Sequence, residues 1–432
     1  MNFYNLKHKE EQLSFKEATI KGQGKEKGLF FPEDISKFSN EFLQNLPNLS
    51  NEEIAFQVMK DFAGDEIPEA ELRKIVAETI AFDIPLKKVT ENISVLELFH
   101  GPTLAFKDVG ARFMSRCLGY FLKNETRKVT VLVATSGDTG GAVANGFYDV
   151  EGIEVVILYP KNRVSPVQEK QLTALGKNIH ALEVNGSFDD CQALVKQAFS
   201  DESLTEKLLL TSANSINVAR WLPQQIYYVL ALKQWLKNNS ENPVICVPSG
   251  NFGNICAGIL AHHRGLPVEH FIAACNVNDV VPEYLRTEIL QPKETVATIS
   301  NAMDVGDPSN FVRILELFDK EFNQVKNKLS GYTIDDEETL KTIKRVEKDY
   351  GYVLDPHGAV AFVALEKYLT ENDGKGFFLE TAHPVKFPDS VEQATGKSVE
   401  IPKSLEELMK QEKFTTEINP QYEELKEFLL KK

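Results

Sequence analysis

The chain has 432 residues, of which 42% are hydrophobic and 26% are charged, proportions typical of a globular protein with more than one hydrophobic core. Its formal net charge of −15 argues against nucleic acid or an anionic membrane as the main partner. No apolar run is long enough to span a bilayer, and the polar N-terminus lacks the apolar core of a signal peptide, so we expect a cytoplasmic protein.

The cysteines and histidines give no sign of a metal site. The five cysteines are odd in number and their spacings match no zinc motif, so we expect reduced thiols in the core. The paired histidines, His262 and His263, lack a convincing partner ligand. A position on the surface of a helix is favoured for both, and no metal is expected.

The pattern of apolar residues divides the chain into three parts. Residues 1–92 are expected to form a mostly helical N-terminal domain, with helices near 40–44, 52–61 and 69–82. From about residue 93, short apolar segments alternate with helical ones, which predicts an α/β catalytic region over 93–395. We expect two lobes there, each with an open, mostly parallel sheet flanked by helices. Residues 396–432 are rich in Glu and Lys and are expected to form a helical tail.

The individual elements of the α/β region follow from the same pattern. The predicted strands cover 95–99, 129–134, 155–159, 244–247, 271–274 and 377–379. The predicted helices cover 106–122, 140–148, 188–199, 222–237 and 253–263. In such sheets ligands bind at the carboxyl ends of strands, where helix N-termini offer free N–H groups.

The first candidate catalytic segment, LFHGPTLAFKD, places Lys107 at the start of a predicted helix, after a Gly-Pro turn and among apolar residues. An ordinary lysine has a pKa near ~10.4. Desolvation and cationic neighbours lower that pKa, and the neutral amine can then form a Schiff base. Most lysines are solvated surface residues, so a catalytic role for Lys107 is indicated only together with the loops downstream.

The loop TSGDTGG follows the predicted strand at 129–134 and contains Thr135, Ser136, Gly137, Asp138 and Thr139. Its small residues let the backbone close round a ligand, and its hydroxyl and N–H groups suit a carboxylate or a phosphate. A tight turn with Asp138 or Thr139 as the N-cap explains the same residues. Both interpretations remain open.

The loop VPSGNFGN follows the predicted strand at 244–247 and contains Gly250, Asn251, Phe252, Gly253 and Asn254. The two glycines permit close approach of the backbone to a dianion, and the dipole of the following helix favours negative charge. The spacing matches neither a dinucleotide fingerprint nor a Walker A loop. A phosphate cradle is favoured.

A third loop, FFLETAHPVKF, ends a predicted strand at Thr381, and Pro384 prevents its continuation. The Thr381 hydroxyl could bind a ring nitrogen, although taken alone a strand-ending turn is the simpler explanation.

Two further segments supply polar and basic residues for an anion pocket, and for each residue taken singly a surface ion pair or turn is the simpler explanation. These candidates are Lys161, Arg163, Ser165, Asn217 and Arg220.

Together these segments resemble the threonine synthase family, whose members are fold-type II enzymes that use pyridoxal 5′-phosphate (PLP). The resemblance covers nearly the whole chain, and the longer bacterial and fungal branch, which has its own N-terminal domain, fits better than the plant-type branch. The matching segments are YNLK, GLFFP, HGPTLAFKD, TSGDTGGA, YPKNRVSPVQEKQL, FDDCQALVKQAF, SANSINVAR, VPSGNFGN, NAMDVGDPSN, DPH at 355–357, and TAHPVKF.

The resemblance implies roles for individual residues. It makes Lys107 the Schiff-base lysine, loop 250–254 the cradle for the PLP phosphate, and Thr381 the partner of the pyridine nitrogen. It makes loop 135–139 the clamp for the substrate carboxylate. The candidates for the substrate phosphate are Lys161, Arg163, Ser165, Asn217 and Arg220.

The reaction implied is the last step of threonine biosynthesis, in which O-phospho-L-homoserine and water give L-threonine and phosphate. A monomer is expected, with a dimer as the alternative. Two other functions remain open: another fold-type II activity, such as a hydroxy-amino-acid dehydratase or a phospholyase, and a PLP-binding protein without catalysis. A dehydratase needs no second phosphate pocket, so this alternative gains support if Arg163 and Arg220 do not converge near Lys107.

Overall fold

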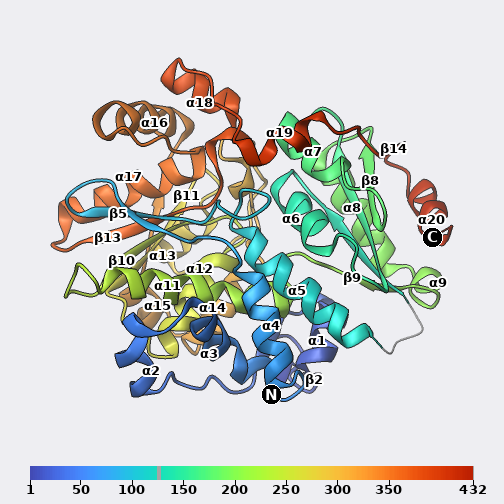
Figure 1. Ribbon diagram of the computed structural model, residues 1–432, viewed down its shortest axis with the longest axis horizontal. Coiled ribbons are helices and arrows are strands. Elements are labelled where there is room, and N and C mark those ends of the chain that lie inside the picture. Colours follow the sequence, from blue (N-terminus) through green and yellow to red (C-terminus); the bar gives the residue numbers. More distant parts are fainter. Residues whose placement is uncertain (124–127, 432) are drawn as a thin grey trace.

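The computed structural model describes residues 1–123 and 128–431, and the strands within these ranges form three sheets (Figure 1). The N-terminal sheet has the order β2 (Gln12–Ser14), β1 (Asn2–Asn5), β3 (Phe30–Pro32). The sheet of the first lobe has the order β12 (Leu329–Thr333), β11 (His270–Cys275), β10 (Val244–Pro248), β13 (Gly376–Glu380), β5 (Ile93–Glu97), β4 (Leu86–Lys88). The sheet of the second lobe has the order β14 (Thr415–Ile418), β8 (Ile179–Val184), β7 (Ile153–Pro160), β6 (Val129–Ala134), β9 (Leu209–Thr211).

The helices surround these sheets. Those before the first lobe are α1 (Phe15–Lys21), α2 (Asn40–Asn45), α3 (Asn51–Ala63) and α4 (Glu69–Thr79). Those of the second lobe and the connection back to the first are α5 (Lys107–Leu122), α6 (Asp138–Phe147), α7 (Pro166–Thr173), α8 (Phe188–Ser200), α9 (Glu202–Thr205), α10 (Val218–Trp221) and α11 (Gln225–Trp235). The rest are α12 (Gly253–His263), α13 (Val280–Thr287), α14 (Phe311–Leu317), α15 (Phe322–Lys328), α16 (Asp336–Tyr350), α17 (Pro356–Glu371), α18 (Pro388–Thr395), α19 (Lys403–Lys410) and α20 (Tyr422–Leu430).

The sheet of the first lobe runs parallel from β12 to β5, and β4 pairs antiparallel with β5. Every residue of β10 and β13 is buried, which explains why their sequences, VICVP and GFFLE, are almost continuously apolar. Because β10, β13 and β5 are parallel neighbours, the loops after them leave the same edge of the sheet.

The sheet of the second lobe is parallel throughout its described strands, and β6 lies between β7 and β9. Its edge strand β14 comes from the tail, which was expected to be helical. The tail crosses from α18 at the first lobe to β14 and α20 at the second (Figure 1). An uncovered edge of β8 would leave backbone N–H and C=O groups unpaired, so β14 completes the sheet.

The N-terminal part is mostly helical, as expected, but it also contains an antiparallel sheet of β1, β2 and β3 that was not predicted. Its helices α2, α3 and α4 lie close to the predicted ranges. In the described part of the chain, no helix is long and apolar enough to cross a membrane.

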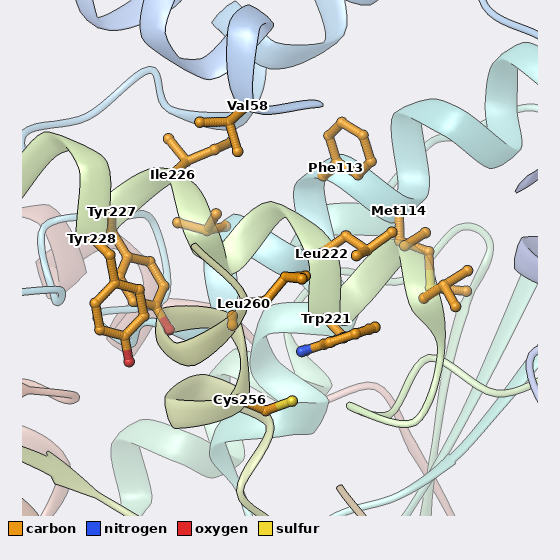
Figure 2. Close-up of a cluster of buried hydrophobic side chains, with 14 of the residues drawn as sticks. Val58, Phe113, Met114, Trp221, Leu222, Ile226, Tyr227, Tyr228, Cys256 and Leu260 are labelled. Carbon is orange, nitrogen blue, oxygen red and sulfur yellow. The ribbon is translucent and has the colours of Figure 1, made fainter. Parts of the chain in front are cut away.

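A continuous hydrophobic core joins the N-terminal helices to the helices of the catalytic region. Figure 2 shows Val58 of α3 near Ile226 of α11, with Phe113 of α5, Trp221 of α10 and Cys256 of α12 in the same cluster, and all five are fully buried. This packing fixes the position of α5, whose first residue is Lys107.

The cysteines are free and buried, as predicted. His262 and His263 are half-buried rather than on the helix surface, because their rings pack against Phe271 and Phe318.

Candidate active site

Lys107 is the first residue of α5 and is held there by the preceding turn. The carboxylate of Asp108 accepts hydrogen bonds from the backbone N–H and the hydroxyl of Thr103, at 2.9 and 2.6 Å. Leu104 has a left-handed conformation with φ of 57°, which is uncommon for a residue other than glycine and marks a turn held by its surroundings. The sequence prediction of a turn followed by a helix is confirmed at this point.

The Lys107 side chain is partly buried, and burial lowers the pKa of its amine to about 8. The negative charge of Asp138 opposes this shift, whereas the positive charges of Lys386 and Arg220 add to it. An amine with this pKa is partly neutral near physiological pH, which is the state that attacks a carbonyl carbon.

The loop after β10 presents a row of free N–H groups. Among the described residues, the backbone N–H groups from Gly250 to Asn254 have no protein acceptor, and Gly253 begins α12. Phe252 has φ of 59°, and a Cβ on Gly250 would lie 2.7 Å from the Cα of Met303. Successive N–H groups at a helix N-terminus form an anion site, and these fit a phosphate dianion.

The side chains of this loop have structural roles instead. The Asn254 amide donates to the carbonyl of Pro248 at 2.9 Å, and its oxygen accepts from Ile255 N–H. The Asn251 amide donates to the Ser215 hydroxyl at 2.8 Å, which ties the loop to the segment after β9. The cradle that the sequence predicts therefore consists of backbone N–H groups.

Thr381 is the first residue after β13 and contacts the segment before Lys107. Its carbonyl accepts the N–H of Phe106 at 2.9 Å, and Ala382 forms a β-bridge with Ala105. The Thr381 residue is largely buried, and its hydroxyl makes no hydrogen bond to another described residue. This hydroxyl is therefore available to a ligand atom that accepts or donates a hydrogen bond.

The loop after β6 is shaped by its own side chains. The Thr135 hydroxyl accepts N–H bonds from Gly137 and Gly140, both at 2.9 Å. Gly137 has φ of 135°, and a Cβ there would lie 2.4 Å from the Gln168 side chain, so the position requires glycine. Among the described residues, the backbone N–H groups of Ser136, Asp138 and Thr139 have no protein acceptor and remain available to an anion.

Asp138 is buried and paired rather than free. Its carboxylate lies 2.7 Å from the Lys386 ammonium and accepts the Gln168 amide at 2.9 Å. Burial raises the pKa of Asp138, but the charges of Lys386 and Lys107 and these hydrogen bonds outweigh burial and hold the pKa well below its usual range. Asp138 therefore stays ionised beside Lys107.

The candidates for an anion pocket separate into two groups. Arg220 is buried, it donates to the carbonyl of Ala213, and its Nε–H has no partner among the described residues. Burial lowers its pKa to about 10, and Asp108 opposes this shift. The Arg220 guanidinium packs against α5, because its Nε lies 3.0 Å from where a Cβ on Gly110 would be, and its charge acts on Lys107 of the same helix.

The other candidates do not converge there. Lys161 pairs with Glu417 of β14 at 2.8 Å, Arg163 is exposed, and Ser165 is the N-cap of α7. Asn217 caps α10 and also donates to the carbonyls of Thr19 and Ser212, so its amide has no group left for a ligand. The convergence of Arg163 with Arg220 near Lys107 is not observed.

Sequence reasoning missed Lys386, which lies in the TAHPVKF segment, and Asn310, which lies in NAMDVGDPSN. Asn310 donates to the carbonyl of Asn251 at 3.0 Å and so supports loop 250–254. Neither residue has a local pattern that distinguishes it from a surface side chain; the segments that contain them were the only signal.

The fold and the site first indicate a broad class of enzyme. Residues 83–376 match the family model described as pyridoxal-phosphate dependent enzyme, and the N–H cradle, the Lys107 amine and the Thr381 hydroxyl fit PLP. The cofactor is therefore PLP. Residues 2–80 match the model of the threonine synthase N terminus, and residues 358–429 match that of the threonine synthase C-terminal region.

Known threonine synthases are similar to this chain over nearly its full length. The chain is 46% identical to threonine synthase from Haemophilus influenzae over 100% of both chains, and 48% identical to that from Escherichia coli over 94% of both. The crystal structure of Escherichia coli threonine synthase is similar with a TM-score of 0.92, 45% identity and 100% coverage of both chains. PLP-bound threonine synthase from Brucella melitensis gives a TM-score of 0.93 with 34% identity, covering 99% of this chain and 98% of that one. The chain belongs to the threonine synthase family and has the family's activity, that of a PLP-dependent lyase.

Proposed function

We propose that the chain acts on O-phospho-L-homoserine and converts it with water into L-threonine and phosphate. The observation that carries this proposal is the match of both ends of the chain to threonine synthase models, and the buried Arg220, whose charge acts on Lys107 and whose Nε–H no described residue accepts, is in keeping with it. A buried donor without an acceptor costs about 1–3 kcal/mol, so its retention favours an anionic ligand at this position. A dehydratase would need no such group in addition to the cradle for the cofactor phosphate.

The cofactor is held by three adjacent loops. The N–H groups of 250–254 would hold the PLP phosphate, the Lys107 amine would be the covalent attachment point, and the Thr381 hydroxyl would be available to the pyridine nitrogen. A hydroxyl there leaves this nitrogen largely unprotonated, which moderates how strongly the ring withdraws electrons. Bound PLP supplies the electron sink for the carbanion chemistry.

The substrate is held by the loop of the other lobe. The free N–H groups of Ser136, Asp138 and Thr139 bind the substrate carboxylate, and Gly137 and Thr135 shape the loop. Arg220 binds the substrate phosphate and stabilises its charge as it leaves from the γ-carbon. Lys161, Arg163 and Ser165 are secondary candidates for binding the substrate phosphate, and closure of the lobes would have to move them toward it. Asn217 instead positions α10.

Lys107 carries the proton transfers. Its free amine would take the proton from the α-carbon of the substrate and then move protons at the β-carbon, where water adds. A pKa near 8 suits a group that must both accept and donate protons near neutral pH.

We also propose a cytoplasmic monomer with an N-terminal domain at 1–92, a catalytic region at 93–395 and a tail at 396–432. Sedimentation equilibrium of the PLP-loaded protein tests the oligomeric state, because the molecular mass measured for a dimer would be twice that of the chain.

The function is tested by measuring phosphate and threonine formed from O-phospho-L-homoserine by the wild-type protein and by Lys107→Ala. Equal amounts of both products, lost in the variant, support the proposal. Phosphate accompanied by a keto acid would identify a phospholyase. A protein that binds PLP at Lys107 yet forms no product would point to a dehydratase or a non-catalytic PLP carrier.

A further inference from the structure

Lys386 is a fully buried lysine inside the active site with no role in the chemistry described above. It lies in the short helical turn Pro384–Lys386 that follows Thr381. Its ammonium donates to the carbonyl of Thr103 at 2.8 Å and lies 2.7 Å from the Asp138 carboxylate. One side chain thus joins the turn after β13, the backbone before Lys107, and the loop after β6.

The charge of Lys386 acts on several charged neighbours at once. The charges of two cations act on Asp138 of α6: Lys386 and Lys107 of α5. A third cation, Arg220 of α10, acts on Lys107. The other nearby acid, Asp108, accepts two hydrogen bonds from Thr103, and the charge of Lys386 acts on it as well. Without Lys386, Lys107 would be the remaining cation whose charge acts on Asp138.

That alternative pairing would damage the site in two ways. An ion pair between Asp138 and Lys107 would favour the protonated amine, which is not a nucleophile or a base. An uncompensated carboxylate in the loop of Ser136, Asp138 and Thr139 would also repel the carboxylate that this loop is proposed to bind. The cost of desolvating two charged groups is consistent with a function beyond stability.

We propose that Lys386 is a positioning residue for the reaction, whose ammonium neutralises Asp138 and ties loop 135–139 to the turn before Lys107, so that the loop can accept an anionic carboxylate and Lys107 remains free of an acidic partner. This inference rests on the proposed role of Lys107 as the attachment point of PLP. The recognised chemistry is a carboxylate group on an amino-acid substrate.

The test uses substitutions of similar size that change one charge at a time: Lys386→Met, Asp138→Asn and the double variant. The readout is the absorbance of bound PLP as a function of pH, which reports protonation of the nitrogen that joins it to Lys107. Lys386→Met leaves Asp138 negative and should raise the midpoint by about one pH unit or more, a tenfold change in the proton equilibrium. Asp138→Asn leaves Lys386 positive and should lower it.

The double variant restores neutrality, and its midpoint should return to within a few tenths of a unit of the wild type. Lys328→Met is a matched control, because Lys328 donates to the carbonyls of Val268 and Glu269 away from Lys107, and the variant should leave the midpoint unchanged. A purely structural role for Lys386 would not produce opposite shifts that cancel.

The proposal is overturned if the two single variants shift the midpoint in the same direction or not at all, or if the double variant shifts it further than either. If Lys386→Met alone does not fold, the comparison of Asp138→Asn with the double variant still tests the proposal. Adding Lys386→Met to Asp138→Asn should reverse the shift of the midpoint that Asp138→Asn causes. Failure of the proposed role of Lys107 is recognised separately, as a wild-type PLP spectrum that Lys107→Ala does not change.

Discussion

The backbone N–H of Phe106 donates to the carbonyl of Thr381 at 2.9 Å, which places the residue before Lys107 against the end of β13. This bond follows from the sheet order, in which β13 lies between β5 and β10. It sets Lys107 and the Thr381 hydroxyl on neighbouring loops, at the edge where the phosphate cradle also begins.

The role of the Thr381 hydroxyl is tested by Thr381→Val and Thr381→Ser. Valine has a similar volume but no hydroxyl, so we expect PLP affinity and kcat to fall by roughly tenfold, the equivalent of one lost hydrogen bond of about 1.4 kcal/mol. Serine keeps the hydroxyl and should retain most of both. Titration of the apoprotein with PLP gives the affinity, and equal losses in the two variants would argue against a hydroxyl-specific role.

The backbone cradle predicts that added volume at Gly250 weakens phosphate binding. In Gly250→Ala the new methyl would lie 2.8 Å from the carbonyl oxygen of Ala302, so the loop must shift and PLP affinity should fall at least about tenfold. Gly351→Ala is the control: Gly351 has φ of 68° and no neighbour within 4 Å, so alanine should cost about 1 kcal/mol of stability and leave PLP affinity unchanged.

Arg220 and Lys161 make opposite predictions for substrate binding. Arg220→Met should raise KM for O-phospho-L-homoserine by at least about tenfold, because a charge-assisted hydrogen bond is worth about 1.5–3 kcal/mol. Lys161→Met loses only a partly exposed ion pair with Glu417 and should leave KM within about twofold. Steady-state kinetics on variants with wild-type melting temperatures would contradict the assignment if the two effects were reversed.

The lowered pKa of Lys107 predicts how its removal affects stability of the apoprotein. An unfolded lysine has a pKa near 10.5, whereas burial lowers that of folded Lys107 to about 8. Below pH 8 Lys107 is protonated in both the folded and the unfolded protein, and the folded protein bears the full cost of desolvating its charge. Between pH 8 and 10.5 Lys107 loses its proton in the folded protein only, so this desolvation cost declines. Lys107→Met should therefore stabilise the apoprotein near pH 7, by on the order of 2 kcal/mol, and progressively less as the pH rises to about 10.

Denaturant unfolding of both apoproteins between pH 7 and 10 measures this difference. A gain that grows with pH would contradict the direction of the Lys107 shift.

Asn217 is expected to act on folding rather than on binding. Its amide caps α10 and donates to the carbonyls of Thr19 and Ser212, at 2.9 and 3.2 Å, in a fully buried setting. Asn217→Ala leaves those carbonyls unpaired and should lower the free energy of unfolding by about 2–4 kcal/mol. At a temperature where the variant remains folded, KM should change little; a large rise in KM without loss of stability would restore Asn217 to the substrate pocket.

The sequence identified the loops of the site because each carries its own signal. The segment from Gly253 to His263 was predicted as a helix with the bounds observed for α12, and the glycines before it indicated a cradle. The strand β14 was missed because a four-residue polar strand forms only where the edge of β8 is open to receive it. Lys386 was missed for a similar reason: its meaning depends on Asp138, which is distant in the sequence.

The same limit explains why the basic candidates separate in the structure. Lys161 and Arg220 both follow strands and look equivalent in sequence, yet β14 supplies Glu417 to one and the core encloses the other. Local patterns predict which loops meet at a sheet edge, whereas the direction of each side chain depends on packing between elements far apart in the chain.

The most direct test of the central claim is to reduce the PLP-loaded protein with borohydride and locate the modified lysine by peptide mass spectrometry. We predict that the cofactor is attached to Lys107 and that Lys107→Ala carries no attached PLP. Attachment to another lysine, such as Lys386, or retention of a covalent adduct in Lys107→Ala would contradict this account of the active site.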